Sequence, residues 1–389
     1  MYNFDKLIIR KGTNSVKWDM IANKYKDDQL LPMWVADMDF EVSSDIVDAI
    51  KKRAEHMTYG YTYPSDEFYE SIINWNKKRN NYEIKKEWMT VSIGVVPSIK
   101  AAIFGFTEKG DKILINTPVY SPFQHSVLDA KRELVTSPLI FDGVKYNIDF
   151  DDFECKIKSG VKLFILSNPH NPIGRVWSRE ELEKIVDICY ENNVKILSDE
   201  IHSDITYAGS KHAVINTVSD KAKNISIVCA APSKTFNIAG LNTSFVIVEN
   251  EVVRKQMWDT MSSMGINSVN LFGLTAGEAA YVHGENWLDE MLEYIEGNVD
   301  FVCNYIHEKL PAVKTLKQQA TYLMWLDFRK YGLSQNELMN KLVNEAHVVL
   351  NSGTDFGEEG NGFVRLNVGC PRSMIKQCLD RIIDTFEKN

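Results

Sequence analysis

The sequence lacks any pair of cysteines spaced C-x-x-C, although six cysteines are scattered along its 389 residues. Paired spacings of that kind are typical of zinc sites and redox-active disulfides. We therefore expect reduced thiols, with neither a metal centre nor a disulfide framework. Basic residues are also in deficit, 44 against 53 acidic ones, and the resulting net charge of -9 argues against a nucleic-acid-binding surface.

Long apolar runs are absent as well. No stretch approaches the roughly 20 residues that a membrane-spanning helix requires. The N-terminal residues carry charges where a secretory signal peptide has its apolar core. These absences predict a protein without a membrane segment and with a cytoplasmic location.

Short apolar runs alternate with helical patterns through the middle of the chain. The clearest helical pattern covers residues 182–189, and Ser178 with Glu181 provides the capping-box signature just before it. Regular alternation of this kind predicts an α/β fold, in which helices cover both faces of a mostly parallel sheet. The apolar runs that we interpret as strands are Trp88–Ile93, Lys112–Asn116, Val161–Ser167, Val194–Ser198, Ile225–Ala230 and Ser244–Val248.

The alternation stops near residue 285. A long polar helix is expected over 287–309, and a last helix over 373–388, with two strand-like runs and another helix between them. Strands and helices without regular alternation are typical of an α+β unit. We therefore predict a large domain over 46–284, and a smaller α+β domain formed by residues 1–45 together with 285–389.

Three polar side chains each follow the end of an apolar strand: Asn171, Asp199 and Lys234. Ligand sites of open α/β sheets form at the carboxyl ends of the strands, so these side chains are expected to converge. Pyridoxal phosphate (PLP) requires a lysine for its Schiff base and an acid against its pyridine nitrogen. An amide could also hydrogen-bond its phenolic oxygen. Each motif alone would fit an ordinary surface loop, but the three together favour PLP as the cofactor.

A strand, a glycine and a helix meet at Gly94, which offers a place for the cofactor's phosphate. The free amides of Gly94, Val95 and Val96 would face an anion, helped by the helix dipole, and Pro97 fits the first helical turn. Ser233, beside the lysine, could add a hydroxyl group. A plain strand-to-helix turn remains the alternative.

Three more side chains are candidates near the ring and the substrate. Tyr120 follows a strand and could stack on the ring, or it could pack on its own loop. His202 lies three residues after Asp199 and could approach the phenolic oxygen, or it could be structural. Arg365 lies in an apolar strand, where an unpaired guanidinium is costly. It therefore needs either an internal acid or a ligand carboxylate held by two parallel hydrogen bonds.

Several longer motifs resemble a known family. The most specific are W-V-A-D-M-D-F at 34–40 and S-D-E-I-H-S-D at 198–204, joined by S-N-P-H-N-P-I-G at 167–174 and S-K-T-F-N-I-A-G-L at 233–241. Together they resemble fold-type-I PLP enzymes, the aminotransferase superfamily, and most of all its MalY/PatB-type branch of cystathionine β-lyases (C–S lyases). The motifs extend from near residue 32 to near 372, so the resemblance covers almost the whole chain.

The resemblance implies a role for each candidate. It also implies an aspartate-aminotransferase-like large domain with a seven-stranded type of sheet. Lys234, Tyr120 and Asp199 would be the catalytic residues, with Lys234 as the Schiff-base lysine and Arg365 as the clamp for the substrate's α-carboxylate. The implied cofactor-binding residues are Lys234, Asp199, Asn171, His202, Tyr120, Gly94, Val95, Val96 and Ser233.

The resemblance further implies a homodimer with shared active sites, the commonest symmetric arrangement. Tyr61 resembles the tyrosine that reaches the phosphate of the neighbouring subunit, and Tyr59 is the second choice. Two positions depart from the wider aminotransferase pattern, because His202 stands where many members have tyrosine, and Asn242 where many have a phosphate-binding arginine. Both departures fit the lyase branch, and both leave open which groups replace the missing contacts.

The implied reaction is β-elimination from a sulfur-substituted amino acid. Cystathionine would give homocysteine, pyruvate and ammonia, and cysteine or its S-conjugates are further possible substrates. Two alternatives stay open at this point, a PLP-dependent aminotransferase and a PLP-binding regulatory protein. The sequence does not determine the leaving group, because specificity depends on loop geometry and on the neighbouring subunit.

Overall fold

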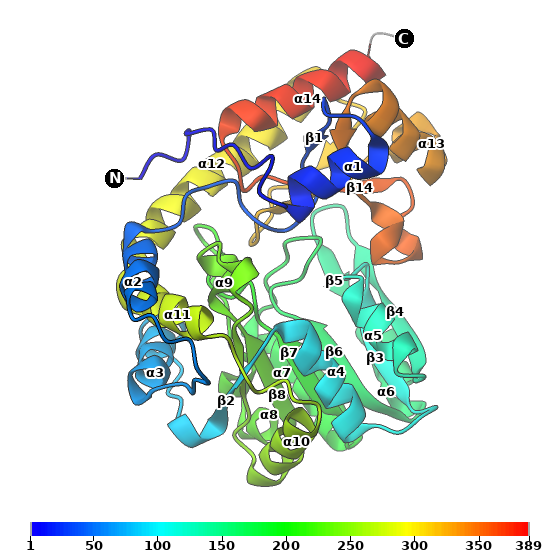
Figure 1. Cartoon of the computed structure of the whole chain (residues 1–389). Helices are drawn as coiled ribbons and strands as arrows, with labels where there is room; N and C mark the ends of the chain where they lie inside the picture. Colours follow the sequence, from blue (N-terminus) through cyan, green and yellow to red (C-terminus); the bar gives the residue numbers. More distant parts are fainter. Residues whose placement is uncertain (1, 388–389) are drawn as a thin grey trace.

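The structure is a computed structural model that describes residues 2–387 (Figure 1). Its centre is an eight-stranded sheet in which five neighbouring strands run parallel. At one edge a single further strand pairs antiparallel with this group, and at the other edge two further strands are added in antiparallel pairings. In spatial order the strands are β2 (Met89–Ser92), β9 (Ser244–Ile247), β8 (Ser226–Ala230), β7 (Lys195–Asp199), β6 (Val161–Ser167), β3 (Lys112–Thr117), β4 (Glu133–Phe141) and β5 (Tyr146–Ile148).

The strands at the centre of this sheet are buried on both faces. In β6, Phe164 and Leu166 belong to one buried cluster, whereas Leu163 and Ile165 belong to the other. Continuous apolar runs of this kind are expected where helices cover both faces of a parallel sheet. The helices of the first cluster's face include α6 (Phe150–Lys158), α7 (Arg179–Glu191) and α8 (Asp220–Ile225), and those of the other are α4 (Val95–Phe106), α5 (Pro122–Asp129) and α10 (Glu251–Ser263).

A second, antiparallel sheet lies above the large one in the view of Figure 1. Its order is β10 (Lys314–Thr315), β11 (Leu323–Asp327), β14 (Phe363–Asn367) and β13 (Asn351–Ser352). The N-terminal part of the chain joins this region because β1 (Leu31–Pro32) pairs in parallel with β12 (Val348–Val349). The helices nearby are α1 (Ile21–Tyr25), α12 (Glu285–Lys309), α13 (Gln335–Asn340) and α14 (Arg372–Phe386).

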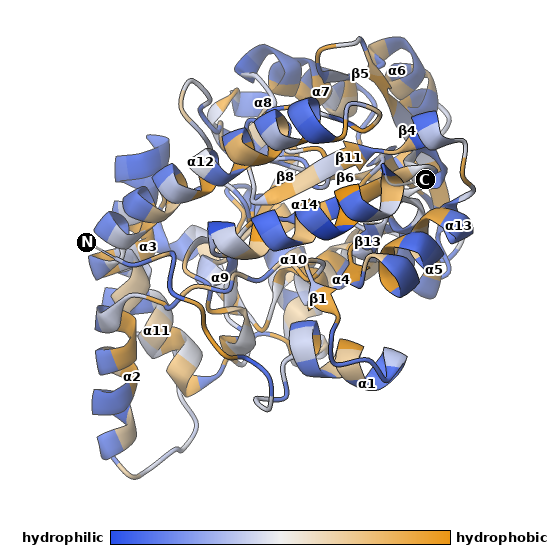
Figure 2. Ribbon diagram, turned by 90° about the horizontal axis from the view of Figure 1, so that it is seen from above, coloured by the Kyte–Doolittle hydropathy of each residue, from blue (hydrophilic) through white to orange (hydrophobic). Residues whose placement is uncertain are grey.

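Helix α14 shows why these C-terminal residues fold as they do. Its buried side chains, from Met374 to Phe386, recur at helical spacing and leave the opposite side polar. Figure 2 shows the resulting alternation of apolar and hydrophilic residues along the helix. The remaining helices, which connect the two sheets or flank the large one, are α2 (Ser44–Glu55), α3 (Asp66–Asn80), α9 (Pro232–Thr235) and α11 (Leu271–His283).

The predicted α/β fold is confirmed, and all six predicted strands are present. The capping box of Ser178 and Glu181 is confirmed at the start of α7. Strands β4 and β5 were not predicted, and together they form a hairpin that extends the sheet beyond the seven-stranded type. The domain bounds at 46 and 285 stay a prediction. None of the helices in residues 2–387 is both long enough and apolar enough to cross a membrane.

Candidate active site

Six of the predicted site residues form one connected group at the carboxyl edge of the large sheet. Asp199 ends β7, Asn171 follows β6, and Lys234 lies in the short helix α9 that follows β8. Arg365 reaches this edge from β14 of the smaller sheet, where its Nη1 donates to Asn171 Oδ1 at 3.0 Å. The other two are Tyr120 and His202. Tyr120 interacts electrostatically with Asp199 and Arg365, and His202 interacts with Lys234 and Arg365. Lys234 in turn interacts with Asp199 and Arg365.

Helix α9 holds Lys234 in a fixed position. Pro232 begins the helix, and the neighbouring Thr235 donates from Oγ1 to Asp204 Oδ2 at 2.9 Å. The other oxygen of Asp204 accepts from Trp75 Nε1 at 2.9 Å. Because the buried Asp204 is bonded on both sides, it connects the turn that carries Lys234 to the helix Asp66–Asn80, which contains Trp75.

The amine of Lys234 donates from Nζ to the carbonyl oxygen of Ala36 at 2.6 Å. Burial lowers the pKa of Lys234 from 10.5 to about 8, although the negative charges of Asp37 and Asp199 oppose this shift. An amine with such a pKa is partly uncharged near neutral pH. It can therefore act as a nucleophile toward an aldehyde or as a base toward a carbon acid.

Asp199 is a buried acid that has no ion-pair partner among residues 2–387. Its Oδ1 accepts from the amide of Ile201 at 3.1 Å. Burial raises the pKa of Asp199 to about 7, while the Ile201 amide and the charge of Lys234 act in the opposite direction. A cationic N–H group placed beside this carboxyl group would stabilise its ionised form.

His202 and Tyr120 contribute neutral polar groups. His202 is buried, and its Nδ1 has no hydrogen-bond partner. Burial, together with the charges of Lys234 and Arg365, lowers the pKa of His202 to about 3. The pKa of Tyr120 is raised by burial and by Asp199, so its phenol stays protonated. Both rings can therefore contact a ligand without adding charge.

Arg365 has only neutral acceptors around its guanidinium group. Its Nη2 donates to the Trp34 carbonyl at 3.1 Å and to Asn351 Oδ1 at 2.6 Å, and its Nε is buried without a partner. The ring of Phe356 lies 4.8 Å from the guanidinium carbon. Burial lowers the pKa of Arg365 to about 10. Within residues 2–387 no carboxylate forms an ion pair with it, so of the two predicted alternatives the geometry favours a ligand carboxylate.

The predicted phosphate cradle lies at the start of α4. Gly94 is the residue before the helix, and the first-turn amides have no partners within a helix. Val95 packs in the same buried cluster as Ala231, which directly precedes α9. The start of α4 and the segment that carries Ser233 follow strands β2 and β8, which both end beside the start of β9, so both lie at the same edge of the sheet.

Tyr61, unlike the other predicted site residues, does not lie at the carboxyl edge of the large sheet. It is fully exposed on the connection between α2 and α3, which extends along the edge of the molecule (Figure 2). Tyr59, the second choice, is also exposed, and its hydroxyl donates to the Ala54 carbonyl at 2.8 Å.

The sequence did not indicate the acceptors around Lys234 and Arg365. The carbonyl oxygens of Trp34 and Ala36 serve in these positions, and Tyr322 also donates to Ala36 O at 3.0 Å. The string at 34–40 was identified only as a family marker. The position of this segment beside Lys234 was not predicted, because the contact is made by a backbone carbonyl group. Every residue type has such a group, so the sequence carries no signal for it.

Comparison with known proteins identifies the family. The model of the family described as aminotransferase class I and II matches residues 22–382. The chain belongs to this family. It is 43% identical to cystathionine beta-lyase PatB of Bacillus subtilis (strain 168), over 98% of each chain.

Solved structures of relatives show the same fold. A PLP-bound candidate aminotransferase from Clostridium difficile 630 is 47% identical, with a TM-score of 0.97 over 99% of this chain and 100% of that one. The PLP-bound C–S lyase from Staphylococcus hominis is 34% identical, with a TM-score of 0.92 over the full length of both chains.

The residues of this family member fit the cofactor that those structures contain. Lys234 offers an amine of lowered pKa to an aldehyde, and Asp199 offers a buried carboxyl group that a cationic ring nitrogen would stabilise. The unpartnered Nδ1 of His202 and the uncompensated charge of Arg365 remain for oxygen atoms of a ligand. These four groups match the functional groups of PLP and an amino acid.

Proposed function

We propose that this protein is a PLP-dependent C–S lyase that removes the sulfur substituent from an L-amino acid by β-elimination. Cystathionine is the proposed substrate, with homocysteine, pyruvate and ammonia as products, and cysteine S-conjugates are further candidates. The observation that carries the proposal is the group formed by Lys234, Asp199 and Arg365, in which a buried amine of pKa about 8 lies with a buried acid and an uncompensated guanidinium. The similarity to a cystathionine beta-lyase over nearly the whole chain supports the lyase reaction.

Each residue of the group has a proposed task. Lys234 bonds the cofactor's aldehyde, and Asp199 faces the ring nitrogen and keeps it protonated. Asn171 and His202 face the phenolic oxygen, and Tyr120 packs against the ring. The proposed phosphate ligands are the amides of Gly94, Val95 and Val96, with the hydroxyl group of Ser233.

Arg365 binds the substrate's α-carboxylate. Its guanidinium is already desolvated and oriented by Asn171 and Asn351, so little further ordering is needed when the ligand arrives. Two parallel hydrogen bonds to the carboxylate also fix the direction of the Cα–H bond relative to Lys234. PLP, when bound, supplies an electron sink for the negative charge that develops at Cα.

Lys234 moves the proton. With PLP and an amino acid bound, the amine of Lys234 would be free to take up and hold the Cα proton. With a pKa of about 8, roughly a tenth of this amine is uncharged at pH 7, far more than for an ordinary lysine, which suits a general base. The thiolate then leaves from Cβ, and the remaining three-carbon product hydrolyses to pyruvate and ammonia.

The proposal includes a homodimer with shared sites. Tyr61 is fully exposed, and Met57, Tyr59 and Tyr63 on the same connection are exposed as well. A local gathering of large exposed apolar side chains is typical of an interface. Sedimentation of the full chain should give twice the monomer mass, and Tyr61→Ala should weaken PLP binding in the dimer. The cytoplasmic location stays a prediction.

Aminotransferase activity is the second candidate, supported by the similarity to the candidate aminotransferase from Clostridium difficile 630. Both reactions begin with loss of the Cα proton, and nothing in the group around Lys234 prevents proton return to the cofactor. A PLP-binding regulatory protein is the third reading, and it would show a stoichiometric partner together with negligible turnover.

The deciding experiment supplies cystathionine without any keto acid and measures pyruvate and free thiol. A lyase releases both over many turnovers, whereas an aminotransferase stops after one half-reaction. Cysteine and cystine extend the panel, and alanine, which has no leaving group, is the negative control. The Lys234→Ala variant should lose the visible cofactor band while staying folded. An unchanged band in that variant would overturn the assignment of Lys234.

A further inference from the structure

The segment from Trp34 to Phe40, hereafter the strap, crosses the site directly beside Lys234. It has no regular secondary structure, so its carbonyl oxygens need partners from elsewhere. All five carbonyls from Trp34 to Met38 accept a hydrogen bond from a side chain outside the strap. The donors are Arg10, Lys17, Lys234, Asn237, Tyr322, Arg365 and Asn367.

Ion pairs from the N-terminal segment hold the strap from its other side. Arg10 binds both oxygens of Asp37, at 2.9 and 2.7 Å, and also Asp39 at 2.7 Å. Lys17 binds Asp39 at 2.6 Å, and the side chains of this pair are 0% and 1% exposed. The two cations and the two carboxylates compensate one another, so the cluster that anchors the strap has no net charge.

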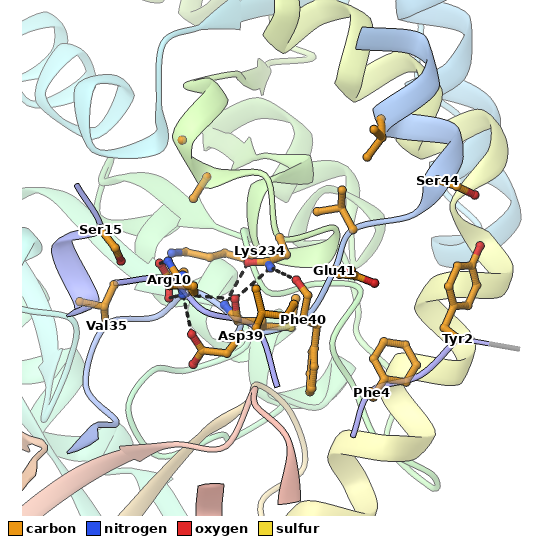
Figure 3. A pocket seen from close by; sticks show the side chains of 18 of the residues that line it. Tyr2, Phe4, Arg10, Ser15, Val35, Asp39, Phe40, Glu41, Ser44 and Lys234 are labelled. Carbon is orange, nitrogen blue, oxygen red and sulfur yellow. Dashed lines mark hydrogen bonds and ion pairs between the residues drawn. The ribbon is translucent and has the colours of Figure 1, made fainter. Parts of the chain in front are cut away.

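The strap and Lys234 line one cavity of about 1160 Å³, which Asp37 and Arg10 also border (Figure 3). Figure 3 shows Lys234 approaching the strap from α9 while Arg10 approaches it from the N-terminal segment. The carbonyl that receives the lysine amine belongs to Ala36, the residue before Asp37. The position of the amine and the position of the Asp37 carboxylate are thus coupled through a single peptide unit.

We propose that Asp37 is a positioning residue for Lys234, which holds the free amine at the Ala36 carbonyl and stabilises its ammonium form, and that Arg10 limits this effect by sharing the same carboxylate. The proposal rests on the assignment of Lys234 as the cofactor lysine. It assigns the N-terminal segment a role in tuning the amine that captures PLP and later moves the Cα proton.

Other charged and titratable groups also face the amine. Asp199 at the end of β7 favours the ammonium form, and Arg365 on β14 opposes it. His202 is neutral because burial keeps its pKa near 3, and the raised pKa of Tyr322 keeps that phenol protonated. Among the charges that favour the ammonium form, Asp37 has the largest effect on the pKa of Lys234, ahead of Asp199.

The test measures the protonation of Lys234 without using catalytic activity. The cofactor-free, full-length protein is mixed with PLP at a series of pH values, and the rate of covalent capture is followed by the visible absorbance. Only the uncharged amine attacks the aldehyde, so the rate rises with pH around the pKa of Lys234. The ionisation of free PLP is the same in every experiment. A difference in the midpoint between two variants therefore reflects a change in the protein.

Asp37→Asn keeps the shape of the side chain and removes its charge. We expect the midpoint of the capture profile to fall by about half a pH unit or more, because the ammonium form loses its strongest charged partner. Asp37→Glu, which restores the charge, should return the midpoint toward the wild-type value. The matched control is Glu41→Gln, since Glu41 lies just after the strap and forms an exposed pair with Lys6. Its midpoint should not move.

Arg10→Gln provides a change of opposite sign. It removes the cation that neutralises Asp37, so the midpoint should rise instead of fall. A purely structural role of the strap would lower the capture rate of both variants at every pH without moving either midpoint, and that result would overturn the proposal. Equal midpoints in Asp37→Asn, Arg10→Gln and wild type would also overturn it.

If the lyase assignment were wrong, the results would differ from those expected if the proposal about Asp37 were wrong. A protein without C–S lyase activity could still capture PLP with the expected midpoint shifts, because this measurement needs only the amine and the aldehyde. Lys234→Ala must abolish covalent capture. Capture that survives in that variant would remove the premise and the proposal together.

Discussion

Arg365 on the smaller sheet and Asn171 on the larger one share a hydrogen bond of 3.0 Å between Nη1 and Oδ1. This bond connects the proposed carboxylate site to the proposed contact of the cofactor's phenolic oxygen. A guanidinium whose acceptors within residues 2–387 are all neutral is prepared for an anion from outside. In the proposed complex the pair would link the substrate's carboxylate to the plane of the ring, and it would favour one orientation of the bond that must break at Cα.

Replacing Arg365 by lysine should separate charge from geometry. Arg365→Lys keeps a cation but loses the planar pair of donors that suits a carboxylate. We expect kcat/KM for cystathionine to fall about 100-fold, because lost pairing at a buried charge costs on the order of 2–5 kcal/mol. Steady-state kinetics of the PLP-loaded protein measure this effect. Arg329→Lys is the control, since Arg329 forms a solvent-exposed pair with Asp327. A similar loss in both variants would contradict the role of Arg365.

Replacing Asp199 by asparagine should act on the chemical step. The variant keeps a side chain of the same shape but cannot hold a proton on the ring nitrogen. We expect kcat to fall by roughly 10²–10³, as when a group that stabilises developing charge is removed. The visible cofactor band should remain, because Lys234 is intact. Asp220→Asn, which changes an exposed acid at the start of α8, should leave kcat as it is. A normal kcat in Asp199→Asn would remove the role proposed for this acid.

The cofactor-free protein should show the energetic cost of the buried amine. The folded-state pKa of Lys234 is about 8, below its ordinary value of 10.5. Between these two pH values the unfolded chain binds more protons at this site than the folded chain, so stability rises with pH there. Below about pH 8 the penalty on the folded state is present in full. Lys234→Met removes the penalty, and it should therefore raise the Tm of the cofactor-free protein at pH 7 more than at pH 10.

Thermal unfolding at the two pH values measures this difference. Lys52→Met serves as the control, because Lys52 is an exposed lysine on α2. Its effect on Tm should be the same at both pH values. If Lys234→Met behaved like this control, the amine would not be desolvated in solution as it is in the structure.

The buried ion pair between Lys17 and Asp39, which anchors the strap, should contribute to the free energy of unfolding. Lys17→Met leaves Asp39 buried with one cation fewer, and breaking a buried pair from one side costs about 3–5 kcal/mol of the free energy of unfolding. Urea denaturation of the full chain measures this loss. Lys6→Met breaks an exposed pair with Glu41 and should cost no more than about 1 kcal/mol. Equal losses in the two variants would show that burial does not strengthen the Lys17–Asp39 pair.

The sequence predicted those parts of the site that depend on side-chain chemistry at strand ends. Lys234, Asp199 and Asn171 are polar residues directly after apolar runs, and parallel strands bring such positions together. Strand β4 escaped prediction because Thr136, Ser137 and Pro138 interrupt its apolar residues. No periodic pattern survives such an interruption.

Other features depend on backbone atoms or on a second chain, and the sequence carries little signal for either. The Ala36 carbonyl accepts the lysine amine, yet alanine at that position predicts nothing about a hydrogen bond. Tyr61 was predicted to complete the site of a neighbouring subunit, and a single chain leaves it exposed. Its role stays a prediction, as do the domain bounds at 46 and 285.

The anchoring of the strap has a practical consequence for anyone who shortens this protein. A trimmed version that starts after residue 20 would keep every residue of the large sheet, but it would lose both Arg10 and Lys17. Asp37 and Asp39 would then repel each other beside the reactive amine. Such a version should therefore bind the vitamin B6 derivative poorly, although its missing piece contains none of the groups that touch it.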